Sequence, residues 1–171
     1  MSSSPPVVLT FAASDPTAGA GVQADILAIA ALGCHPLSVV TALTVQDTSG
    51  VNGVLAVEAR WIEAQARCLL ADMPVAAFKL GVLATPENVR AVASLLAEYP
   101  DVPLVVDPVL ASGRGDTLAS EECLFATKEK IIPLATVATP NCIEAERLGG
   151  AQRLLDLGCR FVLVTDGRAH V

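Results

Sequence analysis

The chain has 171 residues, of which 53% are hydrophobic and 17% charged, and its formal net charge is −7. This length suits one domain, and the apolar content is too high for a disordered chain. The acidic balance, with no cluster of Lys or Arg, argues against a nucleic-acid partner or an anionic membrane surface, because both are bound through basic patches. Aromatic residues make up only 4%, so the core must be built from Ala, Val, Leu and Ile.

The cysteines and the N-terminus give no sign of an oxidising compartment. No C-x-x-C pair occurs, so we expect reduced thiols rather than disulfides or a metal site. Residues 1–6 lack a basic stretch followed by an apolar run, and no run of about 20 apolar residues follows, so we expect a cytoplasmic protein without a membrane span. The five cysteines are Cys34, Cys68, Cys123, Cys142 and Cys159.

The hydrophobic pattern, taken in chain order, alternates between strands and helices. Short β-branched runs predict strands at Val7–Phe11, Ser38–Val45, Ala76–Leu80, Leu104–Val106, Thr136–Ala138 and Phe161–Val164. Longer stretches of helical period predict helices at Gly21–Leu32, Arg60–Met73, Pro86–Tyr99 and Ser120–Ile132, with Thr85 as the N-cap before Pro86. Val51–Val57 predicts an extra strand or hairpin arm. This alternation predicts an α/β fold: an open, mostly parallel sheet with helices on both faces, a three-layer Rossmann-type arrangement.

The C-terminal part of the pattern is unusual for a complete domain. A helix is predicted to start within Ala145–Gly150, and another within Ala151–Leu157, with almost no connection between them. The last predicted strand also lacks a covering helix. We therefore expect residues 1–171 to form a single domain that is incomplete at the C-terminus, with further residues missing near Gly150 and Asp166.

Polar or glycine residues follow nearly every predicted strand. Because ligands bind outside the carboxyl ends of strands in open α/β sheets, we expect a site on this edge. The residues concerned are Ser14, Asp15, Gln46, Asp47, Gly81, Asp107, Asn141, Glu144, Thr165 and Asp166.

The turn Gly19-Ala20-Gly21 is the sharpest local feature, because glycines before a helix let a ligand approach free backbone N–H groups. The alternative interpretation is a plain glycine turn that binds no ligand. Gly19–Ala24 further fits the G-x-G-x-x-A dinucleotide fingerprint, with Asp47 downstream, which gives an oxidoreductase alternative. The carboxylates of Asp15 and Asp25 would repel a pyrophosphate there, so a neutral, hydrogen-bonding ligand is favoured.

Several polar residues carry two interpretations each. Asp25 and Gln46 together offer an acceptor and a mixed donor and acceptor, which suits an aminopyrimidine edge. Alternatively, Asp25 is a first-turn acid that favours the helix dipole, and Gln46 caps a loop. Lys79 either reaches a phosphate or is a solvated lysine at a strand end.

Asp107 and Glu144 are the metal candidates. An acid at the end of a buried strand is costly without a role, so we expect Asp107 to organise a metal and phosphates. Glu144 either assists it or is simply an acid at a helix start that Asn141 caps.

Taken together, these motifs resemble the hydroxymethylpyrimidine/phosphomethylpyrimidine kinases of thiamine biosynthesis, in the ribokinase-like superfamily. The likeness covers essentially the whole chain. It is carried by Ala13–Asp25 (ASDPTAGAGVQAD), Thr41–Thr48 (TALTVQDT), Lys79–Leu83 (KLGVL), Val106–Val109 (VDPV) and Thr139–Asn141 (TPN) with Glu144, in the family's order.

The resemblance implies ATP and Mg²⁺ as cofactors, a pyrimidine substrate and a cytosolic homodimer. It implies that Asp25 and Gln46 hydrogen-bond the pyrimidine and its hydroxymethyl group. It also implies a pocket lined by Ala20, Gly21, Val82 and Val109, Mg²⁺ and ATP phosphates organised by Asp107, Asn141 and Glu144, and a nucleotide near Thr165.

The sequence departs from the family in one important place. Family members carry a Gly-Thr-Gly-Cys or Gly-Thr-Gly-Asp segment that supplies the anion hole and the catalytic base, and nothing here matches it. Gly113–Asp116 has a similar shape but follows a different strand, and is similar to the family's flexible loop. Thr165 stands where many of these kinases have lysine. The sequence thus leaves three hypotheses: a pyrimidine kinase, a pyrimidine-binding module without turnover, and a dinucleotide-binding oxidoreductase.

Overall fold

The predicted strands assemble into one seven-stranded sheet of order β3-β2-β1-β4-β5-β6-β7, in a computed structural model that describes residues 4–109 and 120–165. Only β2 and β3 pair antiparallel; every other neighbouring pair is parallel. The α/β prediction is therefore confirmed. The strands are β1 Val7–Ala13, β2 His35–Asp47, β3 Gly50–Ala56, β4 Ala77–Leu80, β5 Leu104–Val106, β6 Val137–Ala138 and β7 Phe161–Val162.

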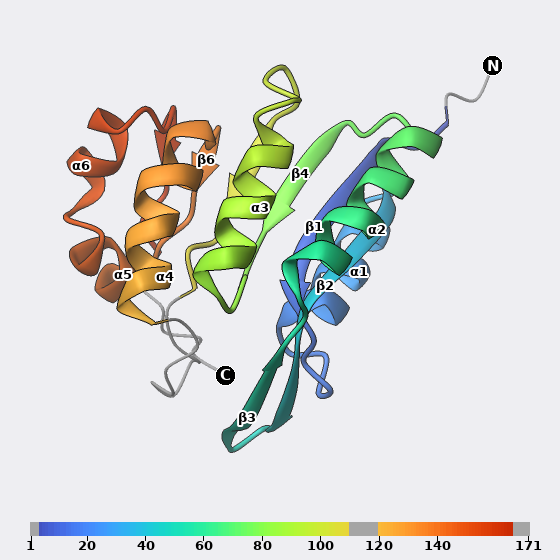
Figure 1. Ribbon diagram of the computed structural model, residues 1–171, viewed down its shortest axis with the longest axis horizontal. Coiled ribbons are helices and arrows are strands. Elements are labelled where there is room, and N and C mark those ends of the chain that lie inside the picture. Colours follow the sequence, from blue (N-terminus) through green and yellow to red (C-terminus); the bar gives the residue numbers. More distant parts are fainter. Residues whose placement is uncertain (1–3, 110–119, 166–171) are drawn as a thin grey trace.

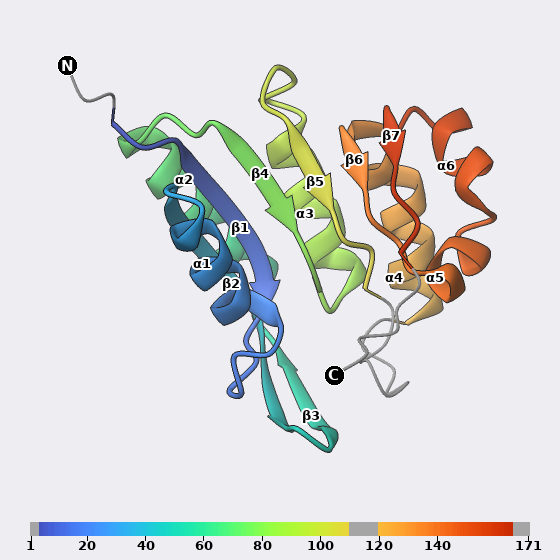
Figure 2. The same cartoon turned by 180° about the vertical axis from the view of Figure 1, so that it is seen from behind.

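Helices cover both faces of this sheet. Figures 1 and 2 show α2, α3 and α4 on one face and α1 on the other. The core between these layers is mainly aliphatic, with Phe11 and Phe78 as its largest fully buried side chains. The helices are α1 Gly21–Ala31, α2 Ala59–Asp72, α3 Pro86–Leu96, α4 Glu121–Ala126, α5 Cys142–Arg147 and α6 Ala151–Asp156.

The β2–β3 hairpin extends past the carboxyl ends of the other strands (Figures 1 and 2). Val51–Val57 is thus confirmed as a hairpin arm, with Ala42 paired to Ala56 and Asp47 to Gly50. Strand β2 starts earlier than predicted, and it includes Pro36. Proline is tolerated there because pairing with β3 begins only at Ala42, so one side of this part of β2 has no strand neighbour.

The segment Ser120–Ile132 is not one regular helix, so that prediction was wrong in detail. Helix α4 gives way to a π-helical turn at Thr127–Ile131 and then to a 3₁₀ turn at Ile132–Leu134, which contains Pro133. The π turn widens the helix by one residue while apolar residues still face the core. The hydrophobic period of the sequence therefore does not reveal it.

Helix α5 runs from Cys142 to Arg147, so it starts before the Ala145–Gly150 segment predicted from the hydrophobic pattern, whereas the interpretation of Asn141 as its N-cap is confirmed. Its start is fixed by a capping box, in which Asn141 Oδ1 accepts from Glu144 N and Glu144 Oε2 accepts from Asn141 N, both at 2.9 Å. At α3, Thr85 accepts from Asn88 N as predicted. Gly113–Asp116 and Asp166 lie outside the described residues.

All five cysteines are free thiols. Within residues 4–109 and 120–165, no helix combines the length and the apolar character needed to cross a membrane.

Candidate active site

A cavity of about 150 Å³ lies at the carboxyl ends of β1, β2, β4 and β5. The structure brings together here six of the residues that the family resemblance assigned to the substrate or the metal: Ala20, Gly21, Gln46, Val82, Asp107 and Val109. Their convergence follows from parallel strands ending at one edge. The remaining described residues that line the cavity are Ala12, Ala13, Ser14, Asp15, Thr44, Val54, Lys79 and Gly81.

The turn after β1 is held by the buried carboxylate of Asp15. Its Oδ1 accepts from Thr17 N at 2.9 Å and its Oδ2 from Ala20 N at 2.9 Å. Gly21 has φ +62°, and a Cβ there would come within 2.5 Å of Ala13 O. Only glycine therefore fits at this position. Since an internal carboxylate already occupies turn amides, the geometry disfavours a pyrophosphate site, and Asp47 instead accepts from Ser49 N and Gly50 N at the hairpin turn.

Gln46 lies near the end of β2 and faces the cavity. Its Oε1 lies 3.3 Å from Thr44 Oγ1, and the single O–H proton of Thr44 is shared between Gln46 Oε1 and the nearer acceptor Ser14 O at 2.8 Å. Gln46 is thus oriented by a neighbour on its own strand, and its amide group can both donate to and accept from a ligand.

The loop after β4 carries Val82 and is fixed by two buried polar side chains. Thr41 Oγ1 donates to Val82 O. Asn88 Nδ2 donates to Leu83 O at 2.9 Å and to Val57 O at 3.0 Å. Thr41 and Asn88 are 0% and 1% exposed, so these bonds are shielded from water and hold the cavity wall firmly.

Asp25 is held in an ion pair beside the cavity. Lys79 Nζ lies 2.9 Å from both Asp25 Oδ1 and Oδ2, and Thr10 Oγ1 donates to Oδ2 at 2.6 Å. Asp25 lies beyond the first turn of α1, so the helix-dipole interpretation was wrong. Lys79 is not a solvated strand-end lysine either, since its side chain is 22% exposed. Among the described residues, Lys79 lines the cavity and Asp25 does not.

Among the described acids, Asp107 is the one whose pKa is raised by burial. Burial raises its pKa from 3.8 to about 6; the Lys79 charge opposes this rise, and the Glu144 and Asp25 charges add to it. Within the described residues, nothing donates a hydrogen bond to its carboxylate. A carboxylate so placed, with other acids nearby, suits a divalent cation.

The donor set fits Mg²⁺ only as part of a larger shell. The described residues contain no group of three or more His, Cys, Asp or Glu side chains that would hold a metal. Mg²⁺ is usually bound through one or two carboxylates together with substrate phosphates, and Asp107 and Glu144 are the carboxylates that would contribute here. Glu144 also uses Oε2 in the capping box, so both interpretations of this residue stay compatible with the structure.

The nucleotide candidates Asn141 and Thr165 lie side by side, after β6 and β7. They form an isolated parallel bridge, with Thr165 N donating to Pro140 O at 2.9 Å. They are not among the residues that line the 150 Å³ cavity.

Sequence reasoning missed Thr10 and gave no role to Thr41, Thr44 or Asn88. A polar residue inside the apolar runs of β1 and β2 is the signal that would have pointed to Thr10 and Thr41, because each is 0% exposed and must find a partner.

Comparison with known proteins decides the family. The profile of the family described as phosphomethylpyrimidine kinase matches residues 15–171. The chain belongs to the phosphomethylpyrimidine kinase family. A hydroxymethylpyrimidine/phosphomethylpyrimidine kinase of Streptomyces coelicolor is 41% identical to the present chain over 175 residues. The match covers 95% of this chain and 65% of the relative. A probable thiamine biosynthetic bifunctional enzyme of rice is 44% identical, with 95% of the chain and 32% of the relative covered. The present chain therefore spans about two thirds or less of the length of these relatives.

Solved structures agree with the family assignment. The crystal structure of the phosphomethylpyrimidine kinase of Clostridium difficile 630 matches with a TM-score of 0.88 and 35% identity, covering 97% of this chain and 77% of that one. A pyridoxal kinase of Staphylococcus aureus, solved with AMP-PCP and pyridoxal, matches with a TM-score of 0.83 and 28% identity, covering 98% and 64%. The ribokinase-like fold class expected from the sequence is thus confirmed.

Proposed function

We propose that the chain forms the substrate-binding part of an ATP-dependent kinase for 4-amino-5-hydroxymethyl-2-methylpyrimidine and its monophosphate, acting in thiamine biosynthesis. The observation that carries this proposal is the cavity at the strand ends, where Gln46, Gly21, Val82 and Asp107 meet in a chain of the phosphomethylpyrimidine kinase family. The ATP requirement is supported by related pyridoxal kinases, which were solved with ADP and AMP-PCP.

In this proposal the residues divide into three groups. Gln46 and Asp25 hydrogen-bond the aminopyrimidine and its hydroxymethyl group, while Ala20, Gly21, Val82 and Val109 line its pocket. Asp107 and Glu144 hold Mg²⁺, which when bound neutralises charge on the ATP phosphates. Asn141 and Thr165 lie near the nucleotide.

The reaction transfers the γ-phosphoryl group from ATP to the hydroxymethyl oxygen. The bond from the γ-phosphorus to the bridging oxygen breaks, a new phosphorus–oxygen bond forms, and the alcohol loses its proton. In a second round the acceptor is an oxygen of the monophosphate. Such transfers depend mainly on positioning and on charge stabilisation, which is what Gln46 and Asp107 would provide. No described residue is assigned as the base.

We also propose that the protein is a homodimer in the cytoplasm. Exposed apolar side chains on the hairpin face that points away from the cavity support the dimer: Leu43, Val45 and Leu55 are 51%, 67% and 67% exposed. Exposed apolar side chains gathered on one face are typical of an interface. Sedimentation analysis of the purified chain and of a Leu55→Asp variant tests it; a wild-type monomer at high protein concentration contradicts the dimer.

The function is tested by binding first and turnover second. Thermal shift with hydroxymethylpyrimidine, ATP–Mg²⁺ and NAD distinguishes the candidate ligands, and ADP release measures turnover. Pyrimidine-dependent ADP release supports the kinase. Pyrimidine binding without ADP release identifies a binding module, and stabilisation by NAD alone overturns the proposal. Asp25→Ala should abolish pyrimidine binding with the fold kept, and unchanged affinity by calorimetry refutes its role.

A further inference from the structure

Lys79 is the one cationic residue among the described residues that line the cavity. Its ammonium group has three N–H donors, and the ion pair with Asp25 Oδ1 and Oδ2, both at 2.9 Å, uses two of them. The third donor has no partner in the described part of the chain. A donor with positive charge is therefore available to a ligand in the cavity.

The backbone is shaped to admit this ammonium group. A Cβ at Gly81 would lie 3.0 Å from Lys79 Nζ, closer than such contacts normally come. Gly81 itself lines the cavity, so the ammonium lies directly beside the cavity wall. Lys79 and Asp107 both line this cavity, and the Lys79 charge opposes the rise in the Asp107 pKa that burial causes.

We propose that Lys79 determines whether the site accepts the phosphorylated form of its substrate, by donating to the phosphate of the monophosphate. This inference rests on the proposed function, and it deepens it. The alcohol is neutral, whereas its monophosphate carries about −1.5 to −2 charges at pH 7. The acids Asp25 and Asp107 repel such an anion, and Lys79 is the cavity residue that offsets them.

Asp25 and Lys79 should then have opposite effects on substrate choice. Removing the ammonium leaves two carboxylates without compensation, so the monophosphate loses more affinity than the alcohol. Removing the Asp25 charge with an isosteric amide leaves the ammonium uncompensated, so the monophosphate gains relative to the alcohol. A residue that only supports the fold would weaken both ligands alike.

The experiment measures the ratio of the two affinities by calorimetry, with hydroxymethylpyrimidine and its monophosphate as ligands, for the whole chain in the absence of ATP. For Lys79→Met we expect the monophosphate-to-alcohol affinity ratio to fall by about tenfold or more, because a charge-assisted hydrogen bond is lost. For Asp25→Asn we expect the ratio to rise, even though both absolute affinities fall.

Controls separate this inference from fold effects. Arg67 on α2 forms an exposed ion pair at 2.7 Å with Glu98, which follows the end of α3, so Arg67→Met should leave the ratio unchanged. If Lys79→Met does not fold, as judged by circular dichroism, the Asp25→Asn ratio still decides, since that variant keeps the ammonium. Equal losses for both ligands in Lys79→Met, or a falling ratio in Asp25→Asn, overturn the inference. A wild-type chain that binds neither ligand overturns the proposed function itself, and an alcohol-only wild type overturns the inference alone.

Discussion

Replacing Asp107 with asparagine should stabilise the protein at neutral pH. Burial raises the pKa of this carboxyl from 3.8 to about 6, so the folded chain holds its proton more tightly than the unfolded chain does. The contribution of the Asp107 carboxyl to the free energy of unfolding is therefore greatest below pH 4. It is lost as the pH rises from about 4 to about 6, and the loss stays constant above that range. Asparagine never ionises, so the variant avoids the loss.

The magnitude follows from the same shift. Each pKa unit is worth about 1.4 kcal/mol, so the rise to about 6 corresponds to roughly 3 kcal/mol at pH 7.5. Because the side chain is not completely buried, solvent screening reduces this to about 1 to 3 kcal/mol. For a domain of this size the melting temperature should rise by several degrees. In the proposed kinase, the same variant should lose its response to ATP–Mg²⁺.

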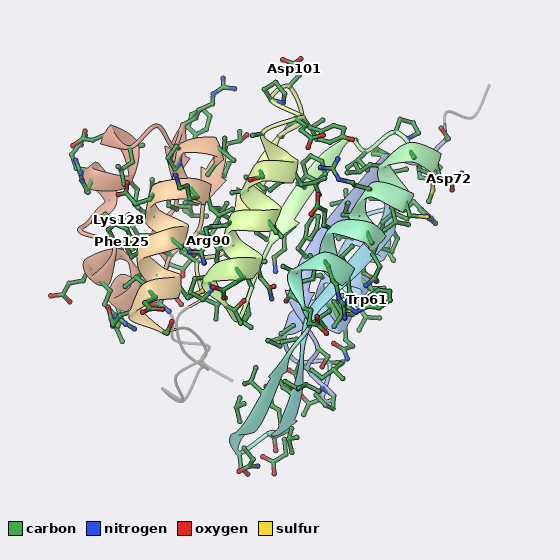
Figure 3. The ribbon with its side chains drawn as sticks, viewed as in Figure 1. Trp61, Asp72, Arg90, Asp101, Phe125 and Lys128 are labelled. Carbon is green, nitrogen blue, oxygen red and sulfur yellow. The ribbon has the colours of Figure 1, made fainter. Side chains whose placement is uncertain are left out.

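Urea unfolding followed by circular dichroism at pH 7.5 and at pH 4 measures the effect. The gain of Asp107→Asn over wild type should be present at pH 7.5 and nearly absent at pH 4. Asp101, which lies on an exposed loop at the opposite end of the sheet (Figure 3), provides the matched control, and Asp101→Asn should change little at either pH. A variant that is less stable than wild type at pH 7.5, or whose gain is equal at both pH values, refutes the reasoning.

Four further substitutions test backbone conformation, buried hydrogen bonds and helix capping by urea unfolding. Gly21→Ala should cost more than about 2 kcal/mol, because its Cβ would meet Ala13 O at 2.5 Å. Gly33→Ala, with positive φ but no atom within 4 Å, should cost about 1 kcal/mol; equal costs contradict the steric explanation. Asn88→Ala removes both Nδ2 hydrogen bonds; Leu83 O keeps Thr85 N as a donor at 2.9 Å, but Val57 O loses the Asn88 donor, so the change should cost about 1 to 3 kcal/mol, and a neutral result rules out those bonds. Asn141→Ala removes the capping box and should cost about 1 kcal/mol, and an unchanged midpoint shows that the cap is dispensable.

Much of the fold could be predicted because the sheet is parallel and buried. Such strands are short apolar runs, and the helices between them repeat with a period of 3.6, so residues such as Leu104–Val106 were assigned correctly from local pattern alone. The π turn at Thr127–Ile131 was missed, since it shifts hydrogen bonds without disturbing the apolar face.

The composition of the cavity was also largely predictable, because strand ends meet at one edge. The ion-pair and hydrogen-bond partners of the charged side chains could not be predicted from the sequence. Lys79 pairs with a carboxylate 54 positions earlier in the chain, and nothing local to Lys79 distinguishes that outcome from a solvated side chain. Asp25 likewise takes its contacts from β1 and β4, which are brought beside α1 only by the tertiary fold.

Part of the cavity wall comes from the antiparallel β2–β3 hairpin, whereas the other strands that reach the cavity are parallel. Val54 lines the cavity from β3, whereas β3 has a single strand neighbour and extends beyond the sheet. Its backbone amides are therefore the ones whose exchange with solvent deuterium should slow most when the cavity fills. The segment Gly50–Ala56 thus provides a built-in reporter of occupancy, readable by deuterium exchange and mass spectrometry without an attached probe and without turnover.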